Sequence, residues 1–293
     1  MTRVAFGIQG SGQLVGGAPD PGVFRETAAR AEELGYDSIW AGDHISYRNP
    51  ILDIVVALST FAAVTSRITL GAGVVLLPLR HPSVVAKEFA SLDYLSGGRT
   101  ILGVGVGGES GPDFDAVGVS PRERGARTDD SMRALRALFG ERPSAYQGRF
   151  FSFEGISIEP PPAQAGGPPL WVGGASEAAI RRAATLGDGW IPIWMSAEKF
   201  AKARAQLPEH VTPAVTMPAH VGDKRALYEH LRIRYSGDFG EHVVDRYCVA
   251  GTPDECAARV REYVDAGARH IVFNILEPTD TDRLAEVVRA AAG

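Results

Sequence analysis

An alternation of short apolar runs with amphipathic segments is the feature that most constrains how this chain folds. The apolar runs have the length and composition of buried strands, and the amphipathic runs have helical spacing. Eight such pairs follow one another along the sequence. The predicted strands are 4–8, 37–41, 68–75, 100–106, 170–172, 189–193, 212–221 and 270–275. The predicted helices are 21–34, 51–64, 83–95, 121–139, 176–186, 197–206, 252–266 and 281–292.

Eight strand–helix units favour a closed barrel over an open sheet. Units of about thirty residues need roughly 240 residues, near the size typical of a (β/α)8 barrel. A doubly wound sheet is the rival fold, but it usually has only about five or six parallel strands. We therefore predict an α/β chain that forms a single TIM-like barrel domain over residues 1–293. Insertions at about 108–120, 143–169 and 222–246 are expected at its C-terminal face, and 146–158 is expected to form a hairpin outside the main sheet.

Composition and charge exclude several classes of function. The formal net charge is −5, which gives no electrostatic reason to expect nucleic acid or a membrane surface as a partner. The two cysteines, Cys248 and Cys256, lie too close together to staple a fold of this size. The chain has neither an apolar run long enough to span a bilayer nor a secretory leader pattern. We expect a cytoplasmic protein that acts on a small molecule.

Active sites of such barrels lie at the carboxyl ends of the strands, so the residues after each strand are the candidates. His44 follows the second strand and could transfer a proton near neutral pH. Asp43 precedes it and could orient a ligand. A loop histidine satisfied by solvent is an equally good interpretation from position alone.

The fourth predicted strand ends in Gly103-Val104-Gly105-Val106-Gly107-Gly108, which matches the GxGxxG pattern of dinucleotide-binding folds. That pattern must open a helix directly, whereas the sequence from Ser110 onward is expected to form a loop, so we reject it. Glu109 remains a candidate proton donor or acceptor, although an exposed loop carboxylate is the slightly better interpretation.

Two other glycine clusters suggest close approach of the backbone to a ligand. Gly71 and Gly73 lie within the third strand, where glycine indicates a bulge or contact with a flat molecule. Gly173 and Gly174 lead into the helix at Ser176, and such a helix start favours binding of a phosphate. Ordinary core packing and an N-cap without a ligand are the alternatives.

No metal centre is predicted, because the chain has no HExxH motif and its seven histidines are dispersed. Arg232, Arg234 and Tyr235 could contact an anionic substrate, but a solvated helix face is the preferred interpretation. Trp190 and Trp194 are expected to pack in the barrel, and His81 is expected to be structural.

Taken in order, these segments resemble the bacterial luciferase-like superfamily, specifically its deazaflavin (coenzyme F-420)-dependent oxidoreductase branch. The resemblance covers nearly the whole chain, and the order and spacing of its segments make it strong. The segments that carry it are 28–40, Gly42-Asp43-His44, 68–74, 95–99, 122–124, Gln147-Gly148-Arg149-Phe150, 170–174 and 251–255.

The resemblance implies a barrel that holds a flavin-type ring over its carboxyl end. Asp43 and His44 would flank the ring, with His44 acting on substrate protons. Gly73-Val74 would form a bulge, often a non-proline cis peptide in this family, behind the ring. The remaining cofactor contacts implied are Gly105, Val106 and Gly107 at the ring edge and Gly173, Gly174, Ala175 and Ser176 at the phosphate. Glu109 resembles an acidic residue opposite the histidine in some members, and a homodimer is the family expectation.

These features predict transfer of a hydride between coenzyme F-420 and a small organic substrate. The compact length favours a deazaflavin, which carries hydride and reacts poorly with oxygen, over FMN. An FMN-dependent monooxygenase is the first alternative, and absorbance of the purified protein distinguishes the two. A non-catalytic cofactor-binding barrel is the second, and Asp43-His44 argues mildly against it.

Overall fold

The computed structural model describes residues 3–9, 20–108, 111–235, 240 and 242–292. Within these residues eight parallel strands close into a barrel in the order β1-β2-β3-β5-β8-β9-β10-β12, and β12 pairs with β1. The barrel strands are β1 (Ala5–Gln9), β2 (Ser38–Ala41), β3 (Thr69–Ala72), β5 (Thr100–Gly105), β8 (Leu170–Gly173), β9 (Gly189–Ile191), β10 (Thr212–Val221) and β12 (His270–Ile275). The predicted barrel is therefore confirmed, and the open-sheet alternative is excluded.

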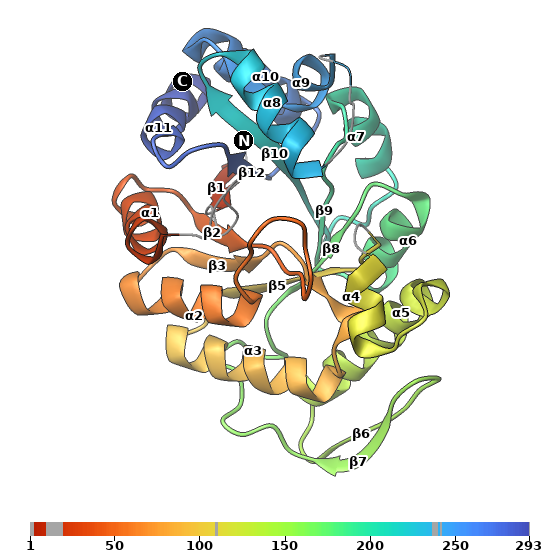
Figure 1. Cartoon of the computed structure of the whole chain (residues 1–293). Helices are drawn as coiled ribbons and strands as arrows, with labels where there is room; N and C mark the ends of the chain where they lie inside the picture. The colour runs from red at the N-terminus through yellow and green to blue at the C-terminus, as the bar shows by residue number, and fades with distance from the viewer. Residues whose placement is uncertain (1–2, 10–19, 109–110, 236–239, 241, 293) are drawn as a thin grey trace.

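Helices cover the outside of the barrel (Figure 1). They are α1 (Pro21–Glu33), α2 (Ile54–Val64), α3 (Pro82–Ser96), α5 (Arg124–Phe139), α6 (Glu177–Leu186), α7 (Ala197–Arg204), α10 (Pro253–Asp265) and α11 (Asp280–Ala292). Their ends follow local capping chemistry. For example, the Asp53 carboxylate accepts from the backbone N–H groups of Val55 and Val56, so α2 begins at Ile54 rather than at the predicted Ile51. Gly35 has the predicted positive φ, +85°, just after α1.

The third predicted strand is interrupted. β3 ends at Ala72, and the chain resumes pairing with β5 as β4 (Val75–Leu76) before the short 3₁₀ helix η1 (Leu77–Leu79). Between the two strands lies the Gly73–Val74 peptide, which is cis as the resemblance implied.

Two of the predicted insertions contain helices that the sequence analysis did not predict. The segment after β5 holds α4 (Gly111–Val117) and the 3₁₀ helix η2 (Pro121–Glu123), so the loop predicted from Ser110 onward is wrong from Gly111. The segment after β10 holds α8 (Lys224–Tyr235), α9 (His242–Tyr247) and the short strand β11 (Val249–Gly251), which pairs with β10.

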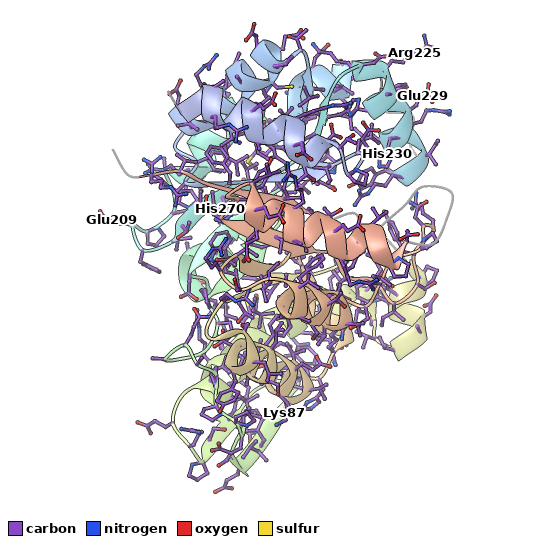
Figure 2. All side chains as sticks on the ribbon, turned by 90° about the vertical axis from the view of Figure 1, so that its left-hand side faces the viewer. Lys87, Glu209, Arg225, Glu229, His230 and His270 are labelled. Carbon is purple, nitrogen blue, oxygen red and sulfur yellow. The ribbon has the colours of Figure 1, made fainter. Side chains whose placement is uncertain are left out.

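The third insertion forms the predicted hairpin, β6 (Ser144–Gln147) with β7 (Ser152–Ile156), which projects from the barrel in Figure 1. It connects the end of α5 to the start of β8, which is the amino-terminal edge of the sheet, so its expected position at the C-terminal face is wrong. The hairpin and the chain after it pack outside α3 and α5. Asp130 in α5 accepts from Phe150 N at 2.6 Å, and Lys87 in α3 donates to the carbonyl of Glu159 (Figure 2).

Aromatic side chains fill the interior of the barrel. The rings of Trp40 and Trp171 lie 5.5 Å apart, and the His270 imidazole meets both edge-on. Figure 2 labels His270. Ser38 Oγ accepts from Trp40 Nε1 and lies 2.7 Å from His270 Nε2. Burial lowers the pKa of His270 to about 4, so this histidine is neutral and structural.

Candidate active site

A cavity of about 240 Å³ opens at the carboxyl ends of the strands, and its wall includes residues of the barrel strands or, for β2 and β3, the residues directly after them. Its polar and ionisable lining residues are Gln9, Asp43, His44, Tyr47, Thr216, Arg234, Tyr235 and Asn274. The other lining residues are Gly42, Gly73, Val74, Leu76, Gly105, Val106, Gly107, Gly173, Gly174, Ile191 and Ile193. The cavity thus brings together most of the predicted site residues, from segments far apart in the sequence.

His44 and Asp113 form a hydrogen-bonded pair in the cavity wall. His44 Nδ1 lies 2.7 Å from Asp113 Oδ2, and the two side chains are only 12% and 1% exposed. An ionised carboxylate only accepts hydrogen bonds, so Nδ1–H donates and Nε2 is the nitrogen left to exchange a proton with a ligand. The imidazole also stacks on the Tyr47 ring at a centroid distance of 4.1 Å. The pair therefore fixes both the tautomer and the orientation that general acid–base chemistry requires.

Asp113 is the residue that the sequence analysis missed at this site. Its second oxygen, Oδ1, accepts from the backbone N–H groups of Ile45 and Ser46 at 2.9 and 2.7 Å. One buried carboxylate thus fastens the whole turn after β2 to helix α4. Asp113 lies 69 positions from His44 in the sequence, and no local pattern connects the two. Glu109, which the sequence analysis named as a candidate proton donor or acceptor, lies outside the described residues.

Asp43 lines the cavity, but its carboxylate is hydrogen-bonded to other groups of the protein. Oδ2 accepts from Leu76 N at 3.1 Å, and Oδ1 forms a 2.8 Å ion pair with Arg80. Burial alone would lower the pKa of Arg80, but the charges and hydrogen bonds of Asp43 and Asp53 outweigh it and raise that pKa. Asp43 therefore anchors the strand that follows the Gly73–Val74 bulge.

Val74 explains two of the predicted glycines. A Cβ at Gly105 would lie 2.4 Å from Val74 Cγ2, and a Cβ at Gly173 would lie 3.0 Å from Val74 Cγ1. These glycines let β5 and β8 close around the Val74 side chain, which is an ordinary steric reason for them. Gly107, with φ +67°, instead lies against the Phe114 ring of α4.

The loop between β8 and α6 partly matches its prediction. Gly173 and Gly174 line the cavity, whereas Ala175 and Ser176 are not among its described lining residues. Ser176 caps α6, with Oγ accepting from Ala179 N at 3.2 Å, and Trp190 Nε1 donates to the Gly174 carbonyl at 2.9 Å. Phosphate binding by this loop stays a prediction.

The interpretation of Arg234 as part of a solvated helix face is wrong. Only Arg232 is exposed as expected, because its side chain is 52% accessible and pairs with Glu229. Arg234 is 9% exposed, lines the cavity with Tyr235, and donates from Nη1 to Asn274 Oδ1 at 3.2 Å. Packing of α8 over the barrel end turns this arginine inward, which helical periodicity alone did not reveal.

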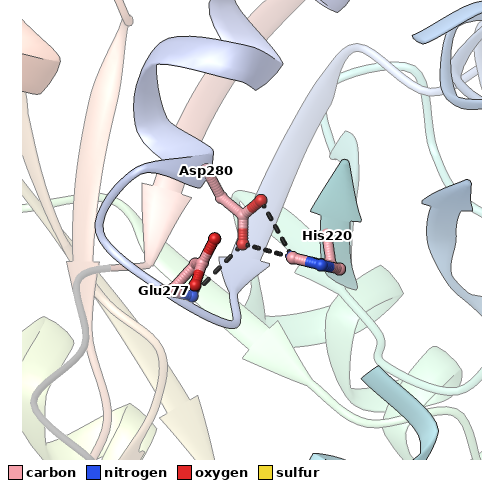
Figure 3. A group of neighbouring side chains, drawn as sticks. All are labelled: His220, Glu277 and Asp280. Carbon is pink, nitrogen blue, oxygen red and sulfur yellow. Dashed lines mark hydrogen bonds and ion pairs between the residues drawn. The ribbon is translucent and has the colours of Figure 1, made fainter. Parts of the chain in front are cut away.

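A second histidine–aspartate pair lies near the same end of the barrel (Figure 3). His220 Nδ1 is 3.1 Å from both carboxylate oxygens of Asp280, and Glu277 completes a group whose ligand atoms lie within 4.8 Å of one another. Asp280 also accepts from Val221 N and Glu277 N. These bonds already satisfy the carboxylate, so the group fixes the start of α11, and the prediction of no metal stays untested.

Comparison with known proteins assigns the family. A family model described as luciferase-like monooxygenase matches residues 3–239. The chain belongs to this family. It is accordingly an enzyme of the oxidoreductase class, as its resemblance indicated. No helix in the described part of the chain is long and apolar enough to cross a membrane.

Relatives with different chemistry cover most of the chain. An F420-dependent glucose-6-phosphate dehydrogenase from Kineococcus radiotolerans is 28% identical and covers 87% of each chain. A 4-hydroxyprotoasukamycin monooxygenase from Streptomyces nodosus subsp. asukaensis is also 28% identical, covering 97% of this chain and 89% of its own. Among solved structures, an F420-dependent secondary alcohol dehydrogenase superposes with a TM-score of 0.86 at 19% identity, covering 99% of both chains. That structural match concerns the fold.

Proposed function

We propose that this enzyme transfers a hydride between coenzyme F-420 and a small organic substrate. The observation that carries the proposal is the His44–Asp113 pair, which faces a cavity edged by glycines at the carboxyl end of the barrel. The F420-dependent relatives support the choice of cofactor.

The cavity walls suit a planar ring. Six of its lining residues are glycines, and Val74, Leu76, Ile191 and Ile193 supply apolar contacts. Gly174 lines the cavity at the turn into α6, and its φ of +114° is a conformation that favours glycine. Because glycine has no side chain, its backbone is accessible to a ligand there. We propose that Gly73, Val74, Gly105, Val106 and Gly107 contact the ring and that Gly173, Gly174, Ala175 and Ser176 hold the phosphate at the start of α6.

In this proposal the cofactor supplies a carbon that gives or takes hydride, and the protein handles the proton. His44 Nε2 accepts the proton of an alcohol substrate on oxidation, or returns it to the carbonyl in the reverse direction. Asp113 acts as a positioning residue because it holds Nδ1–H and stabilises the charged imidazole. Asp43 keeps the wall behind the ring in place through Leu76 and Arg80.

Parallel titration with F-420 and FMN, followed by fluorescence quenching, tests the proposal. We expect tight binding of F-420 and turnover of some alcohol or carbonyl compound in a broad panel. Preferential binding of FMN with oxygen consumption would instead support the monooxygenase alternative, which the Streptomyces relative favours. Tight binding of a cofactor without any turnover would support a non-catalytic barrel.

Two further expectations go with this function. We propose a homodimer, supported by the exposed apolar side chains of Val56 on α2 and of Val84 and Leu95 on α3, and sedimentation of the purified protein tests it. A cytoplasmic location stays a prediction.

A further inference from the structure

Arg234 is a buried cation without a matching anion in the described part of the chain. The residue is 9% exposed, and no carboxylate of the described residues lies within 4.0 Å of its guanidinium. Among the described residues, Nη1 has only the neutral Asn274 amide as an acceptor, and the buried Nε has no hydrogen-bond partner.

The other buried arginine of the described residues is neutralised, and so is the half-buried Arg80. Arg182, 8% exposed, pairs with Asp129, and Arg80 pairs with Asp43 and Asp53. Burying a charge without a partner is costly, so a native structure that does so usually has a reason. The cost is compensated when a ligand supplies the missing negative charge.

The charge of Arg234 affects a neighbouring histidine on α8. His230 is one turn before Arg234 on that helix (Figure 2). Burial, followed by the charges of Arg234 and His220, lowers the pKa of His230 to about 4. His230 is therefore neutral at physiological pH, and the buried positive charge at this end of α8 belongs to the Arg234 guanidinium.

The position of Arg234 separates it from the predicted phosphate loop. In the closed strand order, β8 with Gly173 stands four strands from β1, so the two lie across the barrel from each other. Asn274, the partner of Arg234, is on β12, the neighbour of β1. Arg234 also stays close to the turn that carries His44, because Asn49 Nδ2 donates to its carbonyl oxygen at 3.3 Å.

We propose that Arg234 binds an oxyanion of the substrate, a carboxylate or a phosphate, and that Asn274 positions the guanidinium for it. This inference rests on the proposed function for the presence of a cofactor on the opposite side of the cavity. It adds the substrate class: a small molecule in which the group acted on by His44 is accompanied by an anionic group. Arg234 would then determine specificity rather than take part in proton transfer.

Calorimetric titration with benzoate, its neutral analogue benzamide, and inorganic phosphate tests the inference, with and without F-420. We expect at least one anion to bind wild type, and benzamide to bind at least tenfold more weakly than benzoate if benzoate is that anion. Arg234→Met should weaken binding of the anion at least tenfold, and Arg234→Lys should weaken it less. Whichever of benzoate and phosphate binds more tightly distinguishes a carboxylate from a phosphate.

Arg232→Met is the matched control, because it removes an exposed arginine from the same helix and should leave anion binding unchanged. Circular dichroism and the melting temperature show whether each variant folds, and the comparison of benzoate with benzamide in wild type needs no variant. Absence of anion binding to wild type, or unchanged binding in folded Arg234→Met, would overturn the inference.

The affinity for F-420 separates this inference from the proposed function. Arg234→Met should bind F-420 within about threefold of wild type. If the variant loses F-420 affinity and keeps its anion preference, Arg234 holds the cofactor and the inference is wrong. If wild type binds the anion through Arg234 but binds no F-420, the proposed function fails and the anion site stands.

Discussion

Two histidine–aspartate pairs lie near the carboxyl end of this barrel, and their surroundings give them different uses. In both pairs the carboxylate is almost fully buried, at 1% for Asp113 and 0% for Asp280. His44 lines the cavity, so its Nε2 is accessible to a ligand. His220 Nε2 instead lies against the backbone of Gly222, where even an added Cβ would be only 2.7 Å away. In our proposal the same two residue types thus handle a proton in one place and fasten a helix in the other. The difference lies in the surroundings of Nε2, the ring nitrogen that does not contact the aspartate.

Replacing the two histidines should separate these uses most strongly. His44→Ala removes the proposed proton acceptor, so we expect turnover to fall about 10²–10⁴-fold. The affinity for F-420 should change little, because the contacts proposed for the phosphate and most of those proposed for the ring come from the glycine-containing segments after other strands. Steady-state kinetics and fluorescence titration measure both quantities. Unchanged turnover in a validated assay would refute the role of His44, and His220→Asn serves as the matched control with normal turnover.

Asp113→Asn should have the next largest effect. The amide has the shape of the carboxylate but lacks its charge, so it no longer stabilises a protonated His44 or selects one tautomer. We expect kcat to fall about 10–100-fold. The melting temperature should stay close to that of wild type, because the amide oxygen can still accept from the backbone N–H groups of Ile45 and Ser46. Steady-state kinetics and thermal denaturation measure the two quantities.

A merely structural role for Asp113 predicts a different result. If Asp113 only fastens the turn after β2 through Ile45 and Ser46, the variant should have a lower melting temperature and an unchanged kcat. A kcat equal to that of wild type would therefore remove Asp113 from the mechanism.

The smallest expected effect concerns the pH dependence of stability at His220. Its hydrogen bond to Asp280 raises the pKa of His220, against a smaller lowering by burial, and the Asp280 charge raises it further. This stabilisation is present in full below the unfolded pKa of about 6.5 and is lost as pH rises through the folded value. His220→Asn keeps a neutral donor near Nδ1, so it should flatten the change in unfolding free energy between about pH 6 and pH 8.

Chemical denaturation of wild type and His220→Asn across that range measures the difference, which should be about 1 kcal/mol or somewhat more at the acidic end. Parallel curves for the two proteins would show that His220 is not charged in the fold. Turnover by the variant should remain normal.

The barrel could be predicted because its physical signal is local. Parallel strands covered on both faces are apolar throughout, so runs such as Thr100–Gly105 stand out between amphipathic helices. Helix α4 gave no such signal, because it is short and begins at Gly111-Pro112. Its residues show no periodicity long enough to be recognised.

The site was only half predictable for a related reason. Residues that follow strands, such as His44 and Gly174, are assigned to the cavity once the barrel is assumed. Asp113 and Arg234 are placed instead by how α4 and α8 pack over the end of the barrel. Neither residue type nor periodicity distinguishes Arg234 from the exposed Arg232 two positions before it. Burial of charge is settled by tertiary packing, which a single sequence does not display.

The close fit of Val74 between two neighbouring strands has a consequence for how such a wall could change over generations. A side chain at Gly105 would collide with the valine and one at Gly173 would crowd it, so a larger residue at either position favours a smaller one at position 74. Changes at these three positions are therefore tolerated in combination rather than singly. A change in the shape of this wall therefore requires coordinated substitutions at positions that are far apart in the sequence.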